Sequence, residues 1–145
     1  VNEAGDISDT EEVYWRLVRP HENDDASPLH ADKWFAEILD YDTELLSNKT
    51  TIKAWIPIYL SDPACGLKIV PNSQRNEWKY DVLSRNGHPR PSLAESVETK
   101  LSGVTEGKVL LFGDSLLHGA GVNHSDQTRV SVEITLVLDD YKSAA

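Results

Sequence analysis

Residues of types that bind transition metals occur in two short segments of the sequence. His30 and Asp32 are separated by one residue, and His118 follows much later, directly before a glycine-rich turn. On an extended strand, residues two apart point to the same side, so His30 and Asp32 would present an imidazole and a carboxylate to one point. Two histidines and one carboxylate on one face of a metal are typical of non-haem Fe(II) oxygenases. This ligand set leaves adjacent positions on the metal free for a cosubstrate and oxygen.

A cation that can bind a cosubstrate follows the second histidine. Arg129 lies eleven residues after His118, at the start of an alternating segment, and Ser131 shares its side of that segment. A guanidinium can pair through two hydrogen bonds with the distal carboxylate of 2-oxoglutarate, whose other end chelates the iron. Ser131 can add a hydroxyl to that carboxylate. Each residue alone is more often an ordinary turn or strand residue, and it is their order and spacing together that favour a site.

A second chemistry is suggested by FGDSL at residues 112–116, which matches the motif of the GDSL serine hydrolases. That chemistry requires a strand, a serine turn and a helix in succession, with acidic and histidine partners for the serine further along the chain. Only 30 residues follow Ser115, and they contain neither a helical pattern nor an Asp-x-x-His pair. Hydrolysis through Ser115 is therefore the weakest of the alternatives.

Composition limits the kinds of partner that the protein can have. The 145 residues carry a net charge of −10, which disfavours nucleic acid as a partner. No stretch approaches the roughly 20 apolar residues of a membrane span. Cys65 is the only cysteine, which excludes a disulfide framework and favours a reducing, cytoplasmic location. The expected partner is a small-molecule substrate, and the oligomeric state stays open.

Short strands separated by turn residues dominate the sequence and predict an all-β sandwich or barrel. In the last strand, the alternating apolar residues from Val130 to Leu138 share one face, which is expected to pack. The polar residues from Arg129 to Thr135 share the other face, which is expected to meet water or a polar cavity. The predicted strands cover residues 13–19, 29–35, 51–60, 67–71, 108–113 and 128–139.

These strands predict one domain over residues 13–140. Residues 1–12 are acidic and without periodicity, so they are predicted to be a flexible N-terminus, and residues 141–145 to be a tail. Residues 72–107 form a polar excursion in which NGHPRP is expected to exclude regular structure, with a short helix or strand only around LAESVETKL. An insert of this length is a candidate lid over the site.

Taken in order, these motifs resemble those of the phytanoyl-CoA dioxygenase-like family of Fe(II)/2-oxoglutarate-dependent oxygenases. His30-Ala-Asp32 is similar to the first metal motif of that family, and His118 with Arg129 to the second. The sequence KAWIPI resembles the strand on which the family carries an aromatic residue near the cosubstrate, here Trp55. The sequence GLKIVPNS resembles the G-x-L-x-x-x-P-G-S-H block, shortened by one residue and with its Gly and His replaced. The likeness runs over nearly the whole chain.

The resemblance implies a double-stranded β-helix, the jelly-roll or cupin-like fold, with few or short helices. It implies Fe(II) held by His30, Asp32 and His118, and 2-oxoglutarate bound by Arg129, Ser131 and Trp55. The implied activity is hydroxylation of a small molecule by O2, with release of succinate and CO2 and with ascorbate as a candidate reductant. Halogenating relatives lack the metal carboxylate, so the presence of Asp32 favours hydroxylation. The main alternative is a jelly-roll module that binds a metal or ligand without redox activity.

Overall fold

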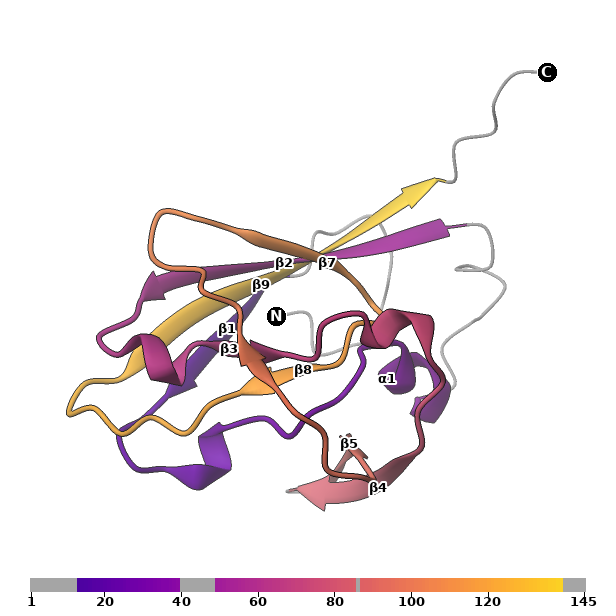
Figure 1. The fold of residues 1–145 in the computed structure, drawn as a ribbon, viewed down its shortest axis with the longest axis horizontal. Coiled ribbons are helices and arrows are strands. Elements are labelled where there is room, and N and C mark those ends of the chain that lie inside the picture. Colours follow the sequence, from indigo (N-terminus) through magenta and orange to yellow (C-terminus); the bar gives the residue numbers. More distant parts are fainter. Residues whose placement is uncertain (1–12, 40–48, 86, 140–145) are drawn as a thin grey trace.

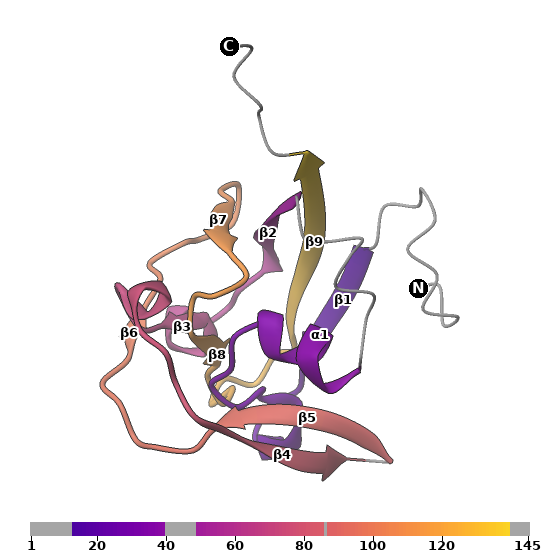
Figure 2. The ribbon, with the colours of Figure 1, turned by 90° about the vertical axis from the view of Figure 1, so that its right-hand side faces the viewer.

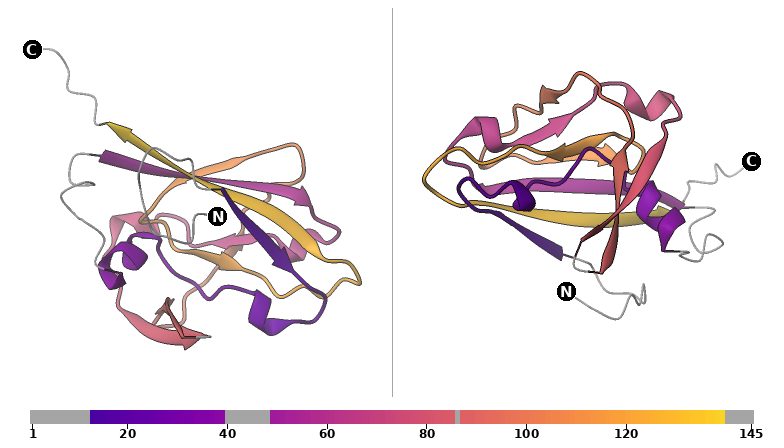
Figure 3. Two further views of the ribbon diagram at one scale, coloured as in Figure 1. Left: turned by 180° about the vertical axis from the view of Figure 1, so that it is seen from behind. Right: turned by 90° about the horizontal axis from the view of Figure 1, so that it is seen from below.

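Four antiparallel strands form the larger sheet of the computed structural model, which describes residues 13–39, 49–85 and 87–139 (Figure 1). β9 pairs with both β1 and β2, so the strand that carries Arg129 and Ser131 lies inside the sheet, with β1 at its edge (Figure 3). β-branched and aromatic residues dominate these segments and favour the extended backbone. In sheet order, the strands are β1 (Val13–Val18), β9 (Arg129–Asp139), β2 (Lys49–Tyr59) and β7 (Leu110–Gly113).

A smaller sheet lies across from the larger one, and a separate hairpin, β4–β5, extends beside it (Figure 2). The smaller sheet contains β6 (Lys100–Leu101), β3 (Leu67–Ile69) and β8 (His118–Ala120), and the hairpin contains β4 (Tyr80–Arg85) and β5 (His88–Leu93). Within the described ranges, regular helix is limited to α1 (Lys33–Ile38) and the short 3-10 turns η1 (Asn23–Asp25), η2 (Pro63–Cys65) and η3 (Ser73–Arg75). Two facing sheets with so little helix confirm the predicted all-β jelly roll. None of these helices is long or apolar enough to cross a membrane.

Apolar side chains from both sheets pack between them and fix the position of the strands that carry the site. Trp55 of β2, Leu67 of β3 and Phe112 of β7 form one buried cluster. A second cluster lies toward the β4–β5 hairpin, where the ring of Trp34 stacks on that of Tyr80 with 4.6 Å between centroids. The buried members of the second cluster are Ala31, Trp34, Val70 and Leu117.

The two faces of β9 alternate as predicted, but the burial of the apolar face differs from the expectation. The polar face is buried at its start, where Arg129 and Ser131 are 2% and 0% exposed, and it lines the interior. On the apolar face, Leu136 and Leu138 are 40% and 46% exposed. The expectation that the apolar face packs is therefore wrong for the second half of the strand.

The predicted strand at residues 29–35 is also wrong. Only His30 makes an isolated β-bridge, and the chain then turns into α1. The backbone N–H groups of Trp34 and Phe35 donate to the carbonyls of Ala31 and Asp32, which starts the helix. The helix buries the Trp34 side chain in the core, and this tertiary packing overrides the strand propensity of the aromatic residues.

Residues 72–107 contain more regular structure than the sequence predicted. Part of NGHPRP, expected to be irregular, lies in β5, which pairs with β4 along its whole length. Proline is tolerated there because β5 pairs within this sheet on one side only. Gly87 adopts a positive φ of 80° in the hairpin turn. The role of residues 72–107 as a lid stays a prediction, and the predicted flexible N-terminus and C-terminal tail lie outside the described residues.

Candidate metal centre

The two histidines of the predicted site lie directly opposite each other on neighbouring backbone segments. The N–H of His30 donates to the carbonyl of His118, and the N–H of His118 donates to the carbonyl of His30, each at 2.9 Å. Such a hydrogen-bonded antiparallel pair points both side chains to the same side. The ring centroids of the two histidines are 4.5 Å apart. Two residues that are 88 positions apart in the sequence therefore lie next to each other in the interior.

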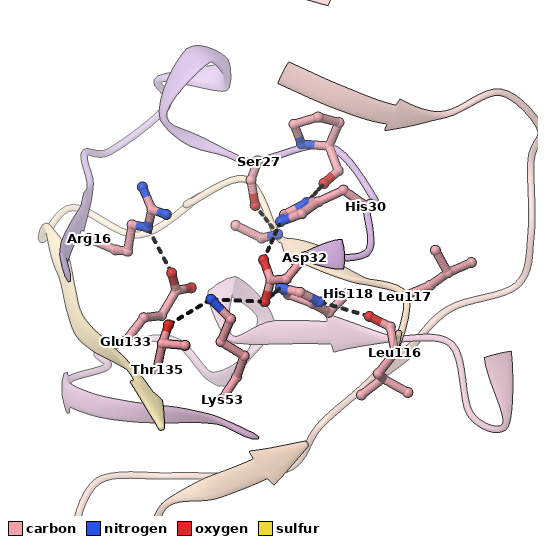
Figure 4. A network of polar contacts seen from close by, with 12 residues as sticks. Arg16, Ser27, His30, Asp32, Lys53, Leu116, Leu117, His118, Glu133 and Thr135 are labelled. Atoms are coloured by element: carbon pink, nitrogen blue, oxygen red, sulfur yellow. Dashed lines mark hydrogen bonds and ion pairs between the residues drawn. The ribbon is translucent and has the colours of Figure 1, made fainter. Parts of the chain in front are cut away.

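Asp32 completes a cluster of three potential metal ligands (Figure 4). Its carboxylate oxygens lie 3.6 Å from Nε2 of His30 and 3.8 Å from Nε2 of His118. These contacts are longer than hydrogen bonds, so the lone pairs of the three groups remain free for a metal ion. One donor atom from each residue lies within 4.8 Å of the others, close to the spacing of atoms that share one metal ion. The donor set of two imidazoles and one carboxylate fits ferrous iron.

Backbone carbonyls orient both imidazoles for metal binding. Nδ1 of His30 lies 2.8 Å from the carbonyl of Pro28, and Nδ1 of His118 lies 2.9 Å from the carbonyl of Leu116. Since a carbonyl only accepts hydrogen bonds, Nδ1 carries the proton in each ring and Nε2 presents its lone pair toward Asp32. Burial lowers the pKa of His118, which favours the neutral ring that a metal ligand requires.

The environment of Asp32 keeps its carboxylate ionised. Burial acts to raise the pKa of Asp32, but the interactions with His30, His118 and Lys53 outweigh burial and hold it well below its usual range. Lys53 places Nζ 3.6 Å from Asp32 and donates a hydrogen bond of 2.7 Å to Thr135. Lys53 was not among the site residues predicted from the sequence. The signal was present, because Lys53 lies two residues before Trp55 and therefore on the same face of β2.

The three residues predicted to bind the cosubstrate also lie on the inner face of the larger sheet. Arg129 donates from Nη1 to the carbonyl of Cys65 at 2.8 Å, and its Cζ lies 6.0 Å from the ring of Trp55. Burial lowers the pKa of Arg129, with Arg16 adding to the shift. Three buried polar atoms in this region have no hydrogen-bond partner among the described residues: Nε1 of Trp55, Nε of Arg129 and Oγ of Ser131.

Buried polar atoms without a partner are costly and call for an explanation. A ligand that brings carboxylate oxygens to this face would accept hydrogen bonds from the guanidinium and the hydroxyl. His30 and Arg129 line the same cavity, which has a volume of about 520 Å³. A small dicarboxylate with one end at the histidine–aspartate cluster and the other at Arg129 therefore fits the chemistry of the cavity wall.

The surroundings of Ser115, the nucleophile of the alternative hydrolase chemistry, differ from those of an activated serine. The hydroxyl of Ser115 donates to the carboxylate of the adjacent Asp114 at 3.0 Å. The nearest histidine in the sequence, His118, directs Nδ1 to a backbone carbonyl and Nε2 to Asp32. Among the described residues, no histidine interacts with Ser115, so the arrangement that activates a serine for hydrolysis is not formed.

Comparison with known proteins relates the chain to one family. The sequence pattern of the phytanoyl-CoA dioxygenase (PhyH) family matches residues 11–131. No curated protein sequence matches the chain.

Several solved structures share the fold. EvdO2 from Micromonospora carbonacea var. aurantiaca, complexed with 2-oxoglutarate, superposes with a TM-score of 0.66 at 16% identity, over 93% of this chain and 55% of that one. The non-heme monooxygenase ThoJ has a TM-score of 0.59 at 9% identity, over 89% of this chain and 45% of that one. AviO1 from Streptomyces viridochromogenes Tue57 has a TM-score of 0.51 at 17% identity, over 94% of this chain and 52% of that one. The chain thus spans about half the length of these proteins.

Proposed function

The chain belongs to the phytanoyl-CoA dioxygenase family, and we propose that it is a non-haem Fe(II)- and 2-oxoglutarate-dependent dioxygenase that hydroxylates a small molecule. The observation that carries this proposal is the meeting of His30, Asp32 and His118 within 4.8 Å, at a point where His30 lines the same cavity as Arg129. A metal cluster alone would suit many proteins. A metal cluster that shares a cavity with a buried, incompletely paired guanidinium suits an enzyme with an anionic cosubstrate.

In this proposal, His30 and His118 bind the metal through Nε2, and Asp32 binds it through a carboxylate oxygen. Bound iron would supply the activation of O2, with 2-oxoglutarate oxidised to succinate and CO2. The protein contributes a rigid arrangement, because both histidines are fixed by backbone pairing and by the carbonyls that accept from Nδ1. With these three protein ligands, a bound iron would have further positions for cosubstrate and oxygen.

Arg129 and Ser131 would bind the distal carboxylate of 2-oxoglutarate, and Trp55 would form the wall beside it. Hydrogen bonds to a charged group contribute roughly 1.5–3 kcal/mol each, more than neutral ones. All three side chains are buried, which strengthens such bonds by excluding water. The unpaired Nε of Arg129 and Oγ of Ser131 would then gain partners. This explains why a charged and a polar side chain are retained on a buried sheet face.

The segment of residues 72–107 is proposed to cover the cavity. The cavity wall includes Arg85, His88 and Arg90 from the β4–β5 hairpin, so this segment already contributes side chains to the site. Closure of such a segment over bound substrate would exclude water from the reaction.

Release of succinate from 2-oxoglutarate, under Fe(II), ascorbate and air, tests the proposal. We expect turnover by the wild type that falls at least about 100-fold in His118→Ala, because loss of one of three ligands weakens metal binding. Ser115→Ala should turn over at the wild-type rate and serves as the matched control. Equal rates for the wild type and His118→Ala above a blank without protein would exclude the proposed centre. A wild type that binds iron but releases no succinate would favour a binding module.

A further inference from the structure

The cavity concentrates positive charge in a strongly acidic protein. Four arginines contribute to its wall, against two carboxylates, whereas the chain as a whole carries a net charge of −10. The four are Arg16, Arg85, Arg90 and Arg129. Arg129 lies deep and is assigned above to the cosubstrate. The arginines from the β4–β5 hairpin have no role in that assignment.

Both carboxylates of the cavity wall are engaged by arginines other than those of the hairpin. Asp25 accepts hydrogen bonds from the side chain of Arg19 at 2.8 and 3.1 Å, and this pairing lowers the pKa of Asp25 to about 2. Glu133 accepts a hydrogen bond of 3.0 Å from Nε of Arg16. Among the described residues, neither carboxylate makes a salt bridge with Arg85 or Arg90.

The hairpin presents its two arginines on one face. Arg90 pairs with Leu83 and His88 pairs with Arg85, so these four residues share a side of the hairpin. Nη1 of Arg85 donates to the backbone carbonyl of Asp24, which satisfies one donor, and Arg85 forms no salt bridge among the described residues, although its charge also acts on Asp25. Within the described part of the chain, Arg90 has neither a hydrogen bond from its side chain nor a salt bridge, although it is partly buried.

Repulsion among these arginines makes the lack of a salt bridge significant. Burial lowers the pKa of Arg90, and the nearby charges of Arg85 and Arg16 lower it further. Arg16 acts in the same direction on Arg129. Positive charge therefore outweighs negative charge along the wall from the cosubstrate end of the cavity to the hairpin, with four arginines against Asp25 and Glu133. A bound anion would relieve this repulsion, and the planar guanidinium matches carboxylate and phosphate oxygens.

We propose that the substrate carries an oxyanion group, a carboxylate or a phosphate, which Arg90 and Arg85 bind at the hairpin side of the cavity. This proposal rests on the proposed function, since it assigns the group to the substrate of that oxygenase. The cosubstrate does not account for these arginines, because its two carboxylates are already assigned to the metal and to Arg129. Binding of the anion at the hairpin would hold the remainder of the substrate toward His30, which lines the same cavity.

Matched pairs of probes test this assignment in the anaerobic protein loaded with Fe(II) and 2-oxoglutarate. Hexanoate is compared with methyl hexanoate, and hexyl phosphate with hexanol, by isothermal titration. We expect at least one anion to bind about tenfold or more tightly than its neutral counterpart, as charged hydrogen bonds to guanidinium would provide. The pair that shows the difference identifies carboxylate or phosphate as the group. Equal affinity within both pairs would overturn the proposal.

Variants test whether the preference for an anion depends on the hairpin arginines or on any positive charge of the protein. Arg90→Gln should remove the preference for the anion, Arg90→Lys should retain part of it, and Arg75→Gln, on the exposed turn η3, should leave it unchanged. An undiminished preference in Arg90→Gln would overturn the proposal.

The charge-transfer absorption of iron-bound 2-oxoglutarate, recorded in the same samples, should persist in Arg90→Gln. If that absorption is absent from the wild type while Arg90-dependent anion binding persists, the oxygenase assignment fails and the anion site remains.

Discussion

The carboxylate of Asp32 lies near three groups at once, which explains how a negative charge is maintained at a partly buried position. Two are the proposed metal-binding histidines, and the third is Lys53, whose Nζ lies 3.6 Å away. Thr135 accepts a hydrogen bond from the same Nζ and fixes its position. Breaking a partly buried pair leaves the remaining charge without compensation, which costs more than the pair contributes.

Lys53→Met should therefore destabilise the metal-free protein by about 1–3 kcal/mol, the usual cost of leaving a buried group unpaired. A divalent metal at the site would compensate Asp32 in the place of Lys53. We thus expect the rise in unfolding temperature on addition of Mn²⁺ to be larger in the variant than in the wild type. Thermal unfolding with and without Mn²⁺ measures this difference, and an equal rise in both proteins would contradict the account.

Ser131→Ala tests the cosubstrate end of the cavity. The hydroxyl has no hydrogen-bond partner among the described residues, so its removal should not lower the free energy of unfolding. If the hydroxyl binds the distal carboxylate of 2-oxoglutarate, its loss should raise the KM for 2-oxoglutarate by about 10- to 150-fold, equivalent to one hydrogen bond to a charged group of roughly 1.5–3 kcal/mol. Stability and KM are measured on the same preparation. Reduced stability with an unchanged KM would assign Ser131 a structural role.

The candidate ligands could be predicted from sequence because histidine and aspartate are typical metal ligands, and because these residues and Arg129 occur in a recognisable order and spacing. His30 and Asp32 are separated by one residue, and Arg129 lies eleven residues after His118. Arg85 and Arg90 could not be predicted, since they reach the cavity only through the β4–β5 hairpin. Their segment was expected to lack regular structure, and no local pattern indicates which distant surface a hairpin will contact.

At the scale of elements, the position of His30 depends on close contact between β8 and the segment before His30. Gly119 lies against the backbone of Ser27, Pro28 and Leu29, where an added Cβ would come within 3.0–3.2 Å of their atoms. Ala120 donates its N–H to the carbonyl of Ser27, which keeps the two segments together. A side chain at position 119 would push this segment away and move His30 with it.

Gly119→Ala should lower the free energy of unfolding by about 1–3 kcal/mol, as overpacking does elsewhere. It should also weaken binding of Fe(II), because His30 shifts relative to His118. Gly113→Ala is the matched control, since no atom lies within 4 Å of its added Cβ and its φ is not in the left-handed region. Chemical denaturation and metal titration of both variants provide the test. Equal effects at the two glycines would show that the close approach at β8 is unimportant.

Long strands were predictable, and short or context-dependent elements were not. The segments of β1, β2 and β9 contain enough alternating or β-branched residues to show the period of a strand. β8 contains only His118, Gly119 and Ala120, too few residues to show any period. α1 was predicted as strand because its aromatic residues favour strands, whereas its conformation is set by burial of Trp34 in the core.

At the scale of the whole molecule, the outer face of the larger sheet is apolar and exposed. Trp15, Leu17 and Leu111 are 58%, 57% and 59% exposed, and pairing places them on the same face as Leu136 and Leu138. Exposed apolar patches of this extent are uncommon on monomeric proteins and commonly mark contact surfaces. Trp15 and Leu17, at the edge strand, also line the cavity, whereas Leu111 and Leu136 do not, so the latter two can be altered without changing the cavity wall.

The double variant Leu111→Lys/Leu136→Lys should lower binding of an apolar fluorescent dye and reduce concentration-dependent association. Both side chains are exposed and neither lines the cavity, so the variant should retain the wild-type circular dichroism and affinity for Fe(II). Dye titration and sedimentation velocity measure the two effects. Unchanged dye binding in a correctly folded variant would show that this face does not behave as an apolar surface in solution.

Absorption spectroscopy under anaerobic conditions tests the central claim most directly, because only an Fe(II) ion chelated by a 2-oxo acid within the site gives the visible charge-transfer band. We predict this band in the wild type on addition of Fe(II) and 2-oxoglutarate. We predict its loss in His118→Ala, and in Arg129→Leu a requirement for at least about tenfold more 2-oxoglutarate. A wild type without the band, or a His118→Ala variant with a band of equal intensity, would contradict the account.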